Sequence, residues 1–172
     1  MSKLVFRGKQ NFQLFTAALG VEAQADAVVD RYRERAAQVR SAVGEDSPTV
    51  SLLRVRADDM RLYQRSSYSG IIVDDVGLPR PESSNYDANF VEVSLETLDT
   101  VDADIVLVAV DSSIEASTVE EFFAQPIWQK LRAEQEGNVH KITSEFWIAG
   151  GGYQGAMEVL DELDAILRAS TP

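Results

Sequence analysis

The run DIVLVAV at residues 104–110 has an apolar side chain at every position after Asp104. A strand that is covered on one face alternates apolar and polar residues, whereas a strand covered on both faces is apolar throughout. Strands of the second kind belong to α/β proteins, in which helices lie on both faces of a sheet. The run therefore predicts a buried strand inside an α/β domain.

The segments on either side of this run alternate between strand and helix patterns. Short apolar runs that follow turn residues predict strands at residues 49–56, 90–93 and 139–142. Apolar residues that recur every three or four positions predict helices at residues 21–43, 67–77, 95–98, 119–123, 126–133 and 153–167. This alternation predicts an α/β fold, a three-layer sandwich with a mostly parallel, Rossmann-like sheet preceded by a long connecting helix.

Composition excludes several classes of function. The 172-residue chain has a formal net charge of −12 and no cysteine. An acidic surface repels nucleic acid, and a chain without cysteine forms no disulfide, thiolate metal site or cysteine nucleophile. No stretch reaches the roughly 18 consecutive apolar residues of a membrane span, so we expect no direct membrane insertion. Residues 1–10 lack the apolar core of a signal peptide.

One basic island interrupts the acidic part of the chain. It consists of Arg54, Arg56, Arg61 and Arg65, which follow the strand predicted at residues 49–56. Ligands of α/β sheets bind beyond the carboxyl ends of the strands, where this island and residues 143–152 should both lie. The island is either a site for an anionic ligand or a solvated strand end with a charged loop.

Residues 150–155, GGGYQG, formally satisfy the G-x-G-x-x-G pattern of dinucleotide-binding proteins. That pattern requires a tight turn directly after a strand and a later strand that ends in an acidic ribose ligand. The segment before Gly150 reads as a long loop instead, and the residues after Gly155 read as one helix. Trp147 in this loop is either a packing anchor or a platform for a planar ligand.

The sequence offers no catalytic constellation. His140 is the only histidine, so histidine-based metal sites are absent, and its place in a predicted strand favours a half-exposed strand residue. Adjacent acids such as Asp74 and Asp75 are more simply explained as solvated faces than as acid–base pairs. No nucleophile motif such as G-x-S-x-G occurs, and the chain is therefore predicted to be no enzyme.

Four runs carry a resemblance to a known family, and they occur in the same order as in that family. They are VSLLRVRADDMRLYQRSSYSGIIVDDVGLPRPES (50–83), FVEVSLETLDTVDADIVLVAV (90–110), AQPIWQKLRAEQEGNVHKI (124–142) and EFWIAGGGYQGAMEVLDEL (145–163). Together they resemble the C-terminal lobe of class III solute-binding proteins, the iron–siderophore-binding group of ABC transporters. The long helix resembles the rigid helix that joins the two lobes in that family.

The resemblance implies a domain organisation and a function. Residues 1–46 would be an inter-lobe helical segment and residues 47–172 the C-terminal ligand-binding lobe. The chain would belong to the extracytoplasmic substrate-binding component of an ABC importer, which binds a ferric siderophore in an inter-lobe cleft and docks on the permease. The full-length protein would reside in the periplasm or on a lipid anchor at the cell surface. The family's N-terminal lobe, signal peptide and lipid-attachment cysteine have no counterpart in this chain.

The resemblance also implies roles for individual residues. The ligand-facing positions correspond to Arg54, Arg61, Tyr63, Arg65, Tyr68 and Trp147, and the acid that docks on the permease corresponds to Glu96. No cofactor and no metal ligand from the protein are expected, because the siderophore holds the iron. The alternatives are a carrier of cobalamin, haem or another metal chelate, and a nucleotide-dependent α/β enzyme that uses the Gly150 loop. Without a first lobe, part of the apolar stripe on the long helix should be bare, which predicts self-association.

Overall fold

The computed structural model describes residues 22–43, 46–142 and 144–170. Five strands form one sheet in the order β3-β2-β1-β4-β5. Their bounds are β1 Val50–Val55, β2 Met60–Tyr63, β3 Phe90–Val93, β4 Ile105–Val110 and β5 Val139–Ile142. Strands β1, β4 and β5 pair in parallel, whereas β2 pairs antiparallel with both β1 and β3. The predicted α/β fold is confirmed, with a mixed sheet.

Strand β4 is the apolar run at residues 104–110, and its residues from Ile105 to Ala109 are buried. A polar clamp holds its start against β1, because the backbone N–H and the hydroxyl of Thr49 both donate to Asp104 Oδ2, at 2.7 and 2.6 Å. The clamp lies next to the first parallel pair of the two strands, Val50 and Ile105. It therefore helps to fix the register of the two most buried strands.

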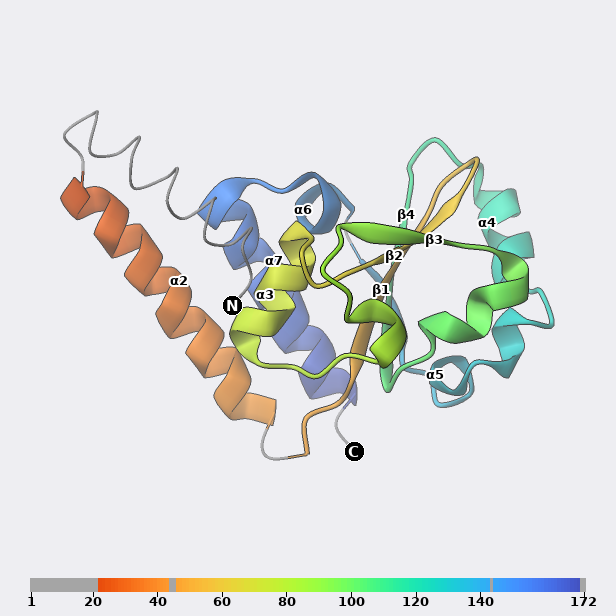
Figure 1. The fold of residues 1–172 in the computed structure, drawn as a ribbon, viewed down its shortest axis with the longest axis horizontal. Coiled ribbons are helices and arrows are strands. Elements are labelled where there is room, and N and C mark those ends of the chain that lie inside the picture. The colour runs from red at the N-terminus through yellow and green to blue at the C-terminus, as the bar shows by residue number, and fades with distance from the viewer. Residues whose placement is uncertain (1–21, 44–45, 143, 171–172) are drawn as a thin grey trace.

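Helices α2 (Glu22–Val43), α3 (Tyr68–Val76), α6 (Ser144–Ala149) and α7 (Gly152–Ser170) lie on one side of the sheet (Figure 1). The long helix predicted for residues 21–43 is confirmed as α2. Its apolar stripe is not bare, because Ala25, Val29, Tyr32, Ala36 and Val39 are all buried. The expectation of an exposed apolar stripe is therefore wrong for the described part of this helix.

The other side of the sheet carries shorter helices, η2 (Leu95–Val101), α4 (Ala116–Phe123), η3 (Trp128–Lys130) and α5 (Arg132–Gln135). They cover a second core cluster that includes Leu53, Val106 and the fully buried Trp128. The single helix predicted for residues 126–133 is two short helices, because Leu131 takes an extended conformation between them. One more single-turn helix, η1 (Glu82–Ser84), lies in the Pro-rich segment before β3.

Besides η1, strand β2 and helix α6 were not expected from the sequence. Arg61 lies in strand β2 and not in a loop, because the chain turns back at Asp58 and Asp59 and the Arg56 N–H donates to the Asp59 carbonyl at 2.9 Å. This β1–β2 hairpin makes the sheet mixed rather than mostly parallel. The loop expected at residues 143–152 contains α6, so only a short glycine turn precedes α7.

Candidate ligand-binding site

Three arginines gather where β1 ends and β2 begins. Arg54 in β1 is the direct cross-strand partner of Arg61 in β2, and Arg56 follows β1. Arg54 Nε donates to Asp111 Oδ1 at 2.8 Å, while Arg56 Nε lies 3.6 Å from Asp111 Oδ2. Together with Asp59, these four residues make up what we call the arginine–aspartate network, which consists of Arg54, Arg56, Arg61, Asp59 and Asp111.

Asp59 closes the other half of the arginine–aspartate network. Its carboxylate accepts from Arg56 Nη1 at 3.1 Å and from Arg61 Nε at 2.9 Å. All the side chains of the network are partly buried, with exposed fractions between 19% and 31%. Partial burial weakens screening by water, so the ion pairs are stronger than pairs on an open surface. The arginines of the predicted basic island are therefore largely paired with aspartates of the same chain.

Aromatic residues support the two strand arginines. The Arg61 guanidinium carbon lies 4.3 Å from the centre of the Phe90 ring, a cation–π contact across β2 and β3. Arg54 Nη1 donates to the Tyr63 hydroxyl at 3.5 Å. Burial lowers the pKa of Arg54, but its hydrogen bonds to Asp111 and Tyr63 outweigh burial and raise that pKa, so the guanidinium is fully charged. Tyr63 is itself buried and orients Arg54.

Arg65 lies apart from the arginine–aspartate network. Its Nε is 4.0 Å from Asp74 Oδ2 on α3, and the same carboxylate accepts from Arg80 Nε at 3.0 Å. The Arg80 side chain is almost fully buried and also donates to the Gly70 carbonyl. Arg65 thus joins a second cluster on the α3 side, with 39% of its side chain exposed.

Tyr68 braces the glycine turn before α7. Its hydroxyl donates to the Gly152 carbonyl at 2.7 Å, and its ring lies beneath Gly150. Burial raises the Tyr68 pKa to about 12, so the phenol is neutral at physiological pH. Gly150 and Gly152 have φ angles of 80° and 60°, which favour glycine. Because α6 separates this turn from β5, the strand–turn–helix geometry of a dinucleotide site is absent here.

Trp147 is a packing anchor in this structure. The side chain has 0% exposed surface and belongs to the core between the sheet and α7. Its indole N–H donates to Glu162 Oε2 at 2.6 Å, which satisfies the polar atom of the buried ring. A ring without exposed surface contacts no ligand in this conformation, so the expectation that Trp147 faces a ligand is corrected here.

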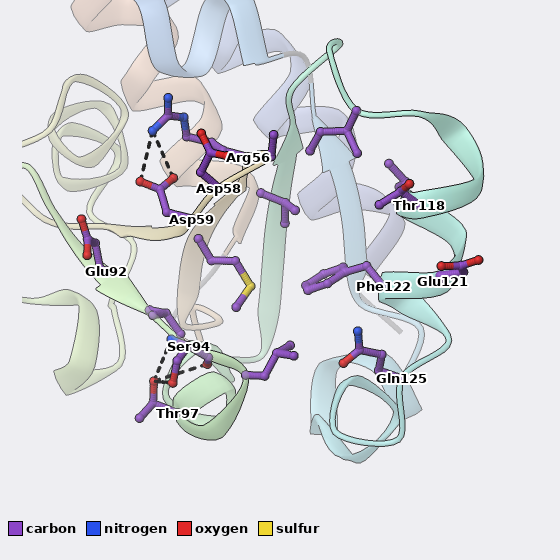
Figure 2. Close-up of a pocket in the computed structure, with 17 residues that line it drawn as sticks. Arg56, Asp58, Asp59, Glu92, Ser94, Thr97, Thr118, Glu121, Phe122 and Gln125 are labelled. Carbon is purple, nitrogen blue, oxygen red and sulfur yellow. Dashed lines mark hydrogen bonds and ion pairs between the residues drawn. The ribbon is translucent and has the colours of Figure 1, made fainter.

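A pocket of about 680 Å³ lies beside the hairpin, between η2 and α4 (Figure 2). Its apolar lining includes Val55, a member of the core cluster on the η2 and α4 side, and Met60 and Phe122, which pack against that cluster. Tyr63 belongs to the other cluster and Phe90 packs against it, so the pocket and the strand arginines face opposite sides of the sheet. Arg56 and Asp59 take part in both the pocket and the network (Figure 2).

Glu96 lies next to this pocket, in the first turn of η2. The residue is exposed, and its neighbours Leu95 and Thr97 line the pocket. Ser94 and Thr97 form a capping box at the start of this helix, which the sequence predicts at residues 95–98. Glu96 is therefore presented to the surface on a well-defined helix start, away from the strand arginines.

The described residues offer no resident metal site. In residues 22–43, 46–142 and 144–170, no group of three or more His, Asp or Glu side chains is placed to hold a metal ion. His140 is half-buried in β5, where its Nε2 lies 2.9 Å from the Ser170 hydroxyl and burial lowers its pKa. Within the same ranges, no helix has the length and apolar character needed to cross a bilayer.

The structure brings together Arg54, Arg61 and Tyr63, and it leaves Arg65, Tyr68, Trp147 and Glu96 in separate surroundings. Sequence reasoning missed Asp59, Asp111 and Phe90 as members of the site. The Asp58–Asp59 pair between two arginine-bearing segments was a usable signal for a charged hairpin. Nothing near Asp111 in the sequence indicates its ion pair with Arg54, since the two residues meet only through the pairing of β1 with β4.

Known proteins with similar sequences or structures agree with this fold. The profile of a family described as "Periplasmic binding protein" matches residues 7–146. The chain is 26% identical over 168 residues, covering 91% of this chain and 52% of the relative, to a "Probable siderophore-binding lipoprotein YfiY" of Bacillus subtilis. It is 28% identical over 169 residues, covering 92% of this chain and 55% of the relative, to an "Achromobactin-binding periplasmic protein" of Dickeya dadantii.

A solved structure extends the likeness to three dimensions. SirA of Staphylococcus aureus complexed with staphyloferrin B superimposes with a TM-score of 0.82 at 23% identity, over 95% of this chain and 62% of SirA. This likeness establishes the fold. The chain spans about half the length of the curated relatives it matches. Both relatives and the family are named as binding proteins, which confirms the prediction that the chain is no enzyme. The family profile covers most residues of the chain. The chain belongs to the periplasmic binding protein family.

Proposed function

We propose that this chain supplies the C-terminal lobe of an extracytoplasmic substrate-binding protein that delivers ferric siderophores to an ABC importer. Residues 47–172 form the ligand-binding lobe, and the helical segment within residues 1–46 connects it to a first lobe. The protein works in the periplasm or at the outer cell surface. The names of the two curated relatives, one siderophore-binding and one achromobactin-binding, support this assignment.

The observation that carries the proposal is the arginine–aspartate network at the carboxyl end of β1 in a member of this family. Guanidinium groups donate paired hydrogen bonds to carboxylate, hydroxamate or catecholate oxygens, which surround the iron of a siderophore. Arg54 and Arg61 are the direct contacts, with Tyr63 behind Arg54 and Phe90 beneath Arg61. The protein supplies no metal ligand and no cofactor, because the iron belongs to the chelate.

The lobe carries one half of the binding site. The strand arginines lie at an edge of the sheet. A chelate that binds there contacts this lobe on one side only. A second lobe closes the cleft over the ligand, so the lobe formed by residues 47–172 binds weakly by itself. Arg65 and the glycine turn held by Tyr68 lie on the α3 and α7 side of that edge and complete its rim. Trp147 acts from the core by fixing α6 against α7.

Glu96 docks on the permease in this proposal. The side chain is exposed on the opposite side of the sheet from the strand arginines, so the protein can hold its ligand and contact the importer at the same time. A carboxylate in this position pairs with an arginine of the permease. Glu96→Gln should reduce transport by the reconstituted importer severalfold and leave chelate affinity unchanged. A fall in chelate affinity would contradict the docking role.

A ligand panel tests the proposal. We expect the intrinsic fluorescence of the chain to be quenched, with saturation, by a ferric hydroxamate, carboxylate or catecholate complex. NAD, ATP, cobalamin and haem should give no saturable change at the same concentrations. A response to cobalamin or haem alone would make the protein a carrier of another chelate, and a response to a nucleotide alone would contradict the whole class of function.

A further inference from the structure

We infer that Asp59 and Asp111 act as internal counter-charges that reduce the preference of the arginine edge for strongly anionic chelates. This inference rests on the proposed function and concerns two residues that the resemblance does not mark. Both are specificity-determining residues in this reading. They discriminate between ligands by charge rather than by shape.

Each aspartate bridges two arginines. Asp111 lies 2.8 Å from Arg54 Nε through Oδ1 and 3.6 Å from Arg56 Nε through Oδ2. Asp59 Oδ2 lies 3.1 Å from Arg56 Nη1 and 2.8 Å from Arg61 Nη2. The three guanidinium groups and two carboxylates leave the arginine–aspartate network with a single net positive charge, instead of three.

The arginines keep donors for a ligand while they hold the aspartates. Nη2 of Arg54, Nη2 of Arg56 and Nη1 of Arg61 have no hydrogen bond to another described residue. A guanidinium has five N–H donors, so a chelate oxygen can bind at these positions without displacing a carboxylate. The carboxylates therefore stay in place and oppose each further negative charge of the ligand.

An acidic neighbour strengthens this opposition. Glu92 in β3 is exposed and is the direct cross-strand partner of Arg61, so its side chain lies on the same face of the sheet as the strand arginines. A triply negative tris-catecholate complex thus meets a site with little excess positive charge. A neutral tris-hydroxamate or a weakly anionic carboxylate complex meets the same donors with less repulsion from the aspartates.

A purely structural role for the aspartates is the competing explanation. The pairs also tie the β1–β2 hairpin to the loop after β4, so either substitution can loosen the edge. Such loosening lowers the affinity for every chelate by a similar factor. The ratio of the affinities for two chelates of different charge separates the two explanations, because only a change in site charge shifts that ratio.

The test compares the 172-residue chain with its Asp59→Asn, Asp111→Asn and Glu158→Gln variants, the last an exposed acid on α7. Each is titrated calorimetrically at low salt with a neutral ferric tris-hydroxamate and with a triply negative ferric tris-catecholate. Each Asn variant should raise the affinity ratio of catecholate to hydroxamate by about three- to tenfold, and the gain should shrink at high salt. Glu158→Gln should leave the ratio unchanged.

An unchanged ratio in folded Asp59→Asn and Asp111→Asn variants would overturn the inference and leave the proposed function standing. Failure of the unsubstituted chain to bind any chelate would instead contradict the proposed function. Circular dichroism and thermal melting establish folding. If an Asn variant does not fold, Arg56→Gln supplies the opposite change of charge and should lower the ratio by a similar factor. An Arg56→Gln variant with an unchanged ratio would equally overturn the inference.

Discussion

Arg54 Nε donates to Asp111 Oδ1 across 2.8 Å, and this contact joins the end of β1 to the first residue after β4. The two residues are 57 positions apart in sequence and meet because their strands are neighbours in the sheet. The pairing holds the Arg54 guanidinium at the carboxyl edge, where ligands of α/β sheets bind. The position of Arg54 therefore makes it the most informative residue to change.

Arg54→Gln should lower chelate affinity about tenfold, because it removes a fully charged donor from the arginine–aspartate network. Arg65→Gln should change the affinity less than about threefold, since Arg65 belongs to the separate cluster around Asp74. Both affinities follow from fluorescence titration with one ferric chelate. A larger loss in Arg65→Gln than in Arg54→Gln would place the site on the α3 side instead.

The Thr49–Asp104 clamp predicts an acid-sensitive contribution to stability. Hydrogen bonds from the Thr49 side chain and backbone lower the pKa of Asp104 from 3.8 to about 2. Because the folded-state pKa is the lower of the two, this contribution is present above pH 4 and is lost as the pH falls toward 2. Asp104→Asn should lower the free energy of unfolding by about 1 kcal/mol at neutral pH and flatten its pH dependence between about pH 4 and 2.

Urea unfolding at a series of pH values measures this effect. Asp99→Asn, an exposed acid in η2, serves as the control and should leave the slope between pH 4 and 2 unchanged. If Asp104→Asn follows the same pH curve as the unsubstituted chain, the clamp carries none of the acid sensitivity.

Trp147→Phe tests the role of the buried tryptophan. The substitution leaves a cavity beside α7 and removes the donor to Glu162, so we expect a loss of about 1–3 kcal/mol in the free energy of unfolding. Trp128→Phe is a matched control in the other layer, because Trp128 is equally buried and donates to Glu134 at 3.0 Å. Both variants should bind chelate within about twofold of the original affinity once correctly folded. A loss of affinity in Trp147→Phe without a loss of stability would make this residue a ligand contact.

The sequence predicts the elements whose side chains repeat with a clear period. Strand β4 is apolar at every position, and α2 and α7 carry long apolar stripes that match their buried faces. The sequence does not predict strand β2, because this strand has only four residues and follows the charged hairpin residues Asp58 and Asp59. In such a short segment, pairing with β1 and β3 decides the conformation, and that pairing is not local information.

The same limit applies to the site. The arginines are visible in the sequence as a basic island, but their aspartate partners are not, since Asp111 reaches Arg54 only through the register of β1 and β4. The sequence also left open whether Trp147 is a packing anchor or a ligand platform, because the choice depends on how α6 packs against α7. Sequence patterns thus indicate which residue types meet a ligand edge, and tertiary contacts decide which of them face it.

Binding of a ferric chelate at the arginine edge is the central claim, and one titration tests it most directly. The 172-residue chain and its Arg54→Gln variant are titrated calorimetrically with a ferric siderophore, and with the same siderophore without iron. We predict saturable binding of the ferric complex to the unsubstituted chain, about tenfold weaker in Arg54→Gln. Absence of saturable binding, or equal affinity in the two proteins, would contradict this account.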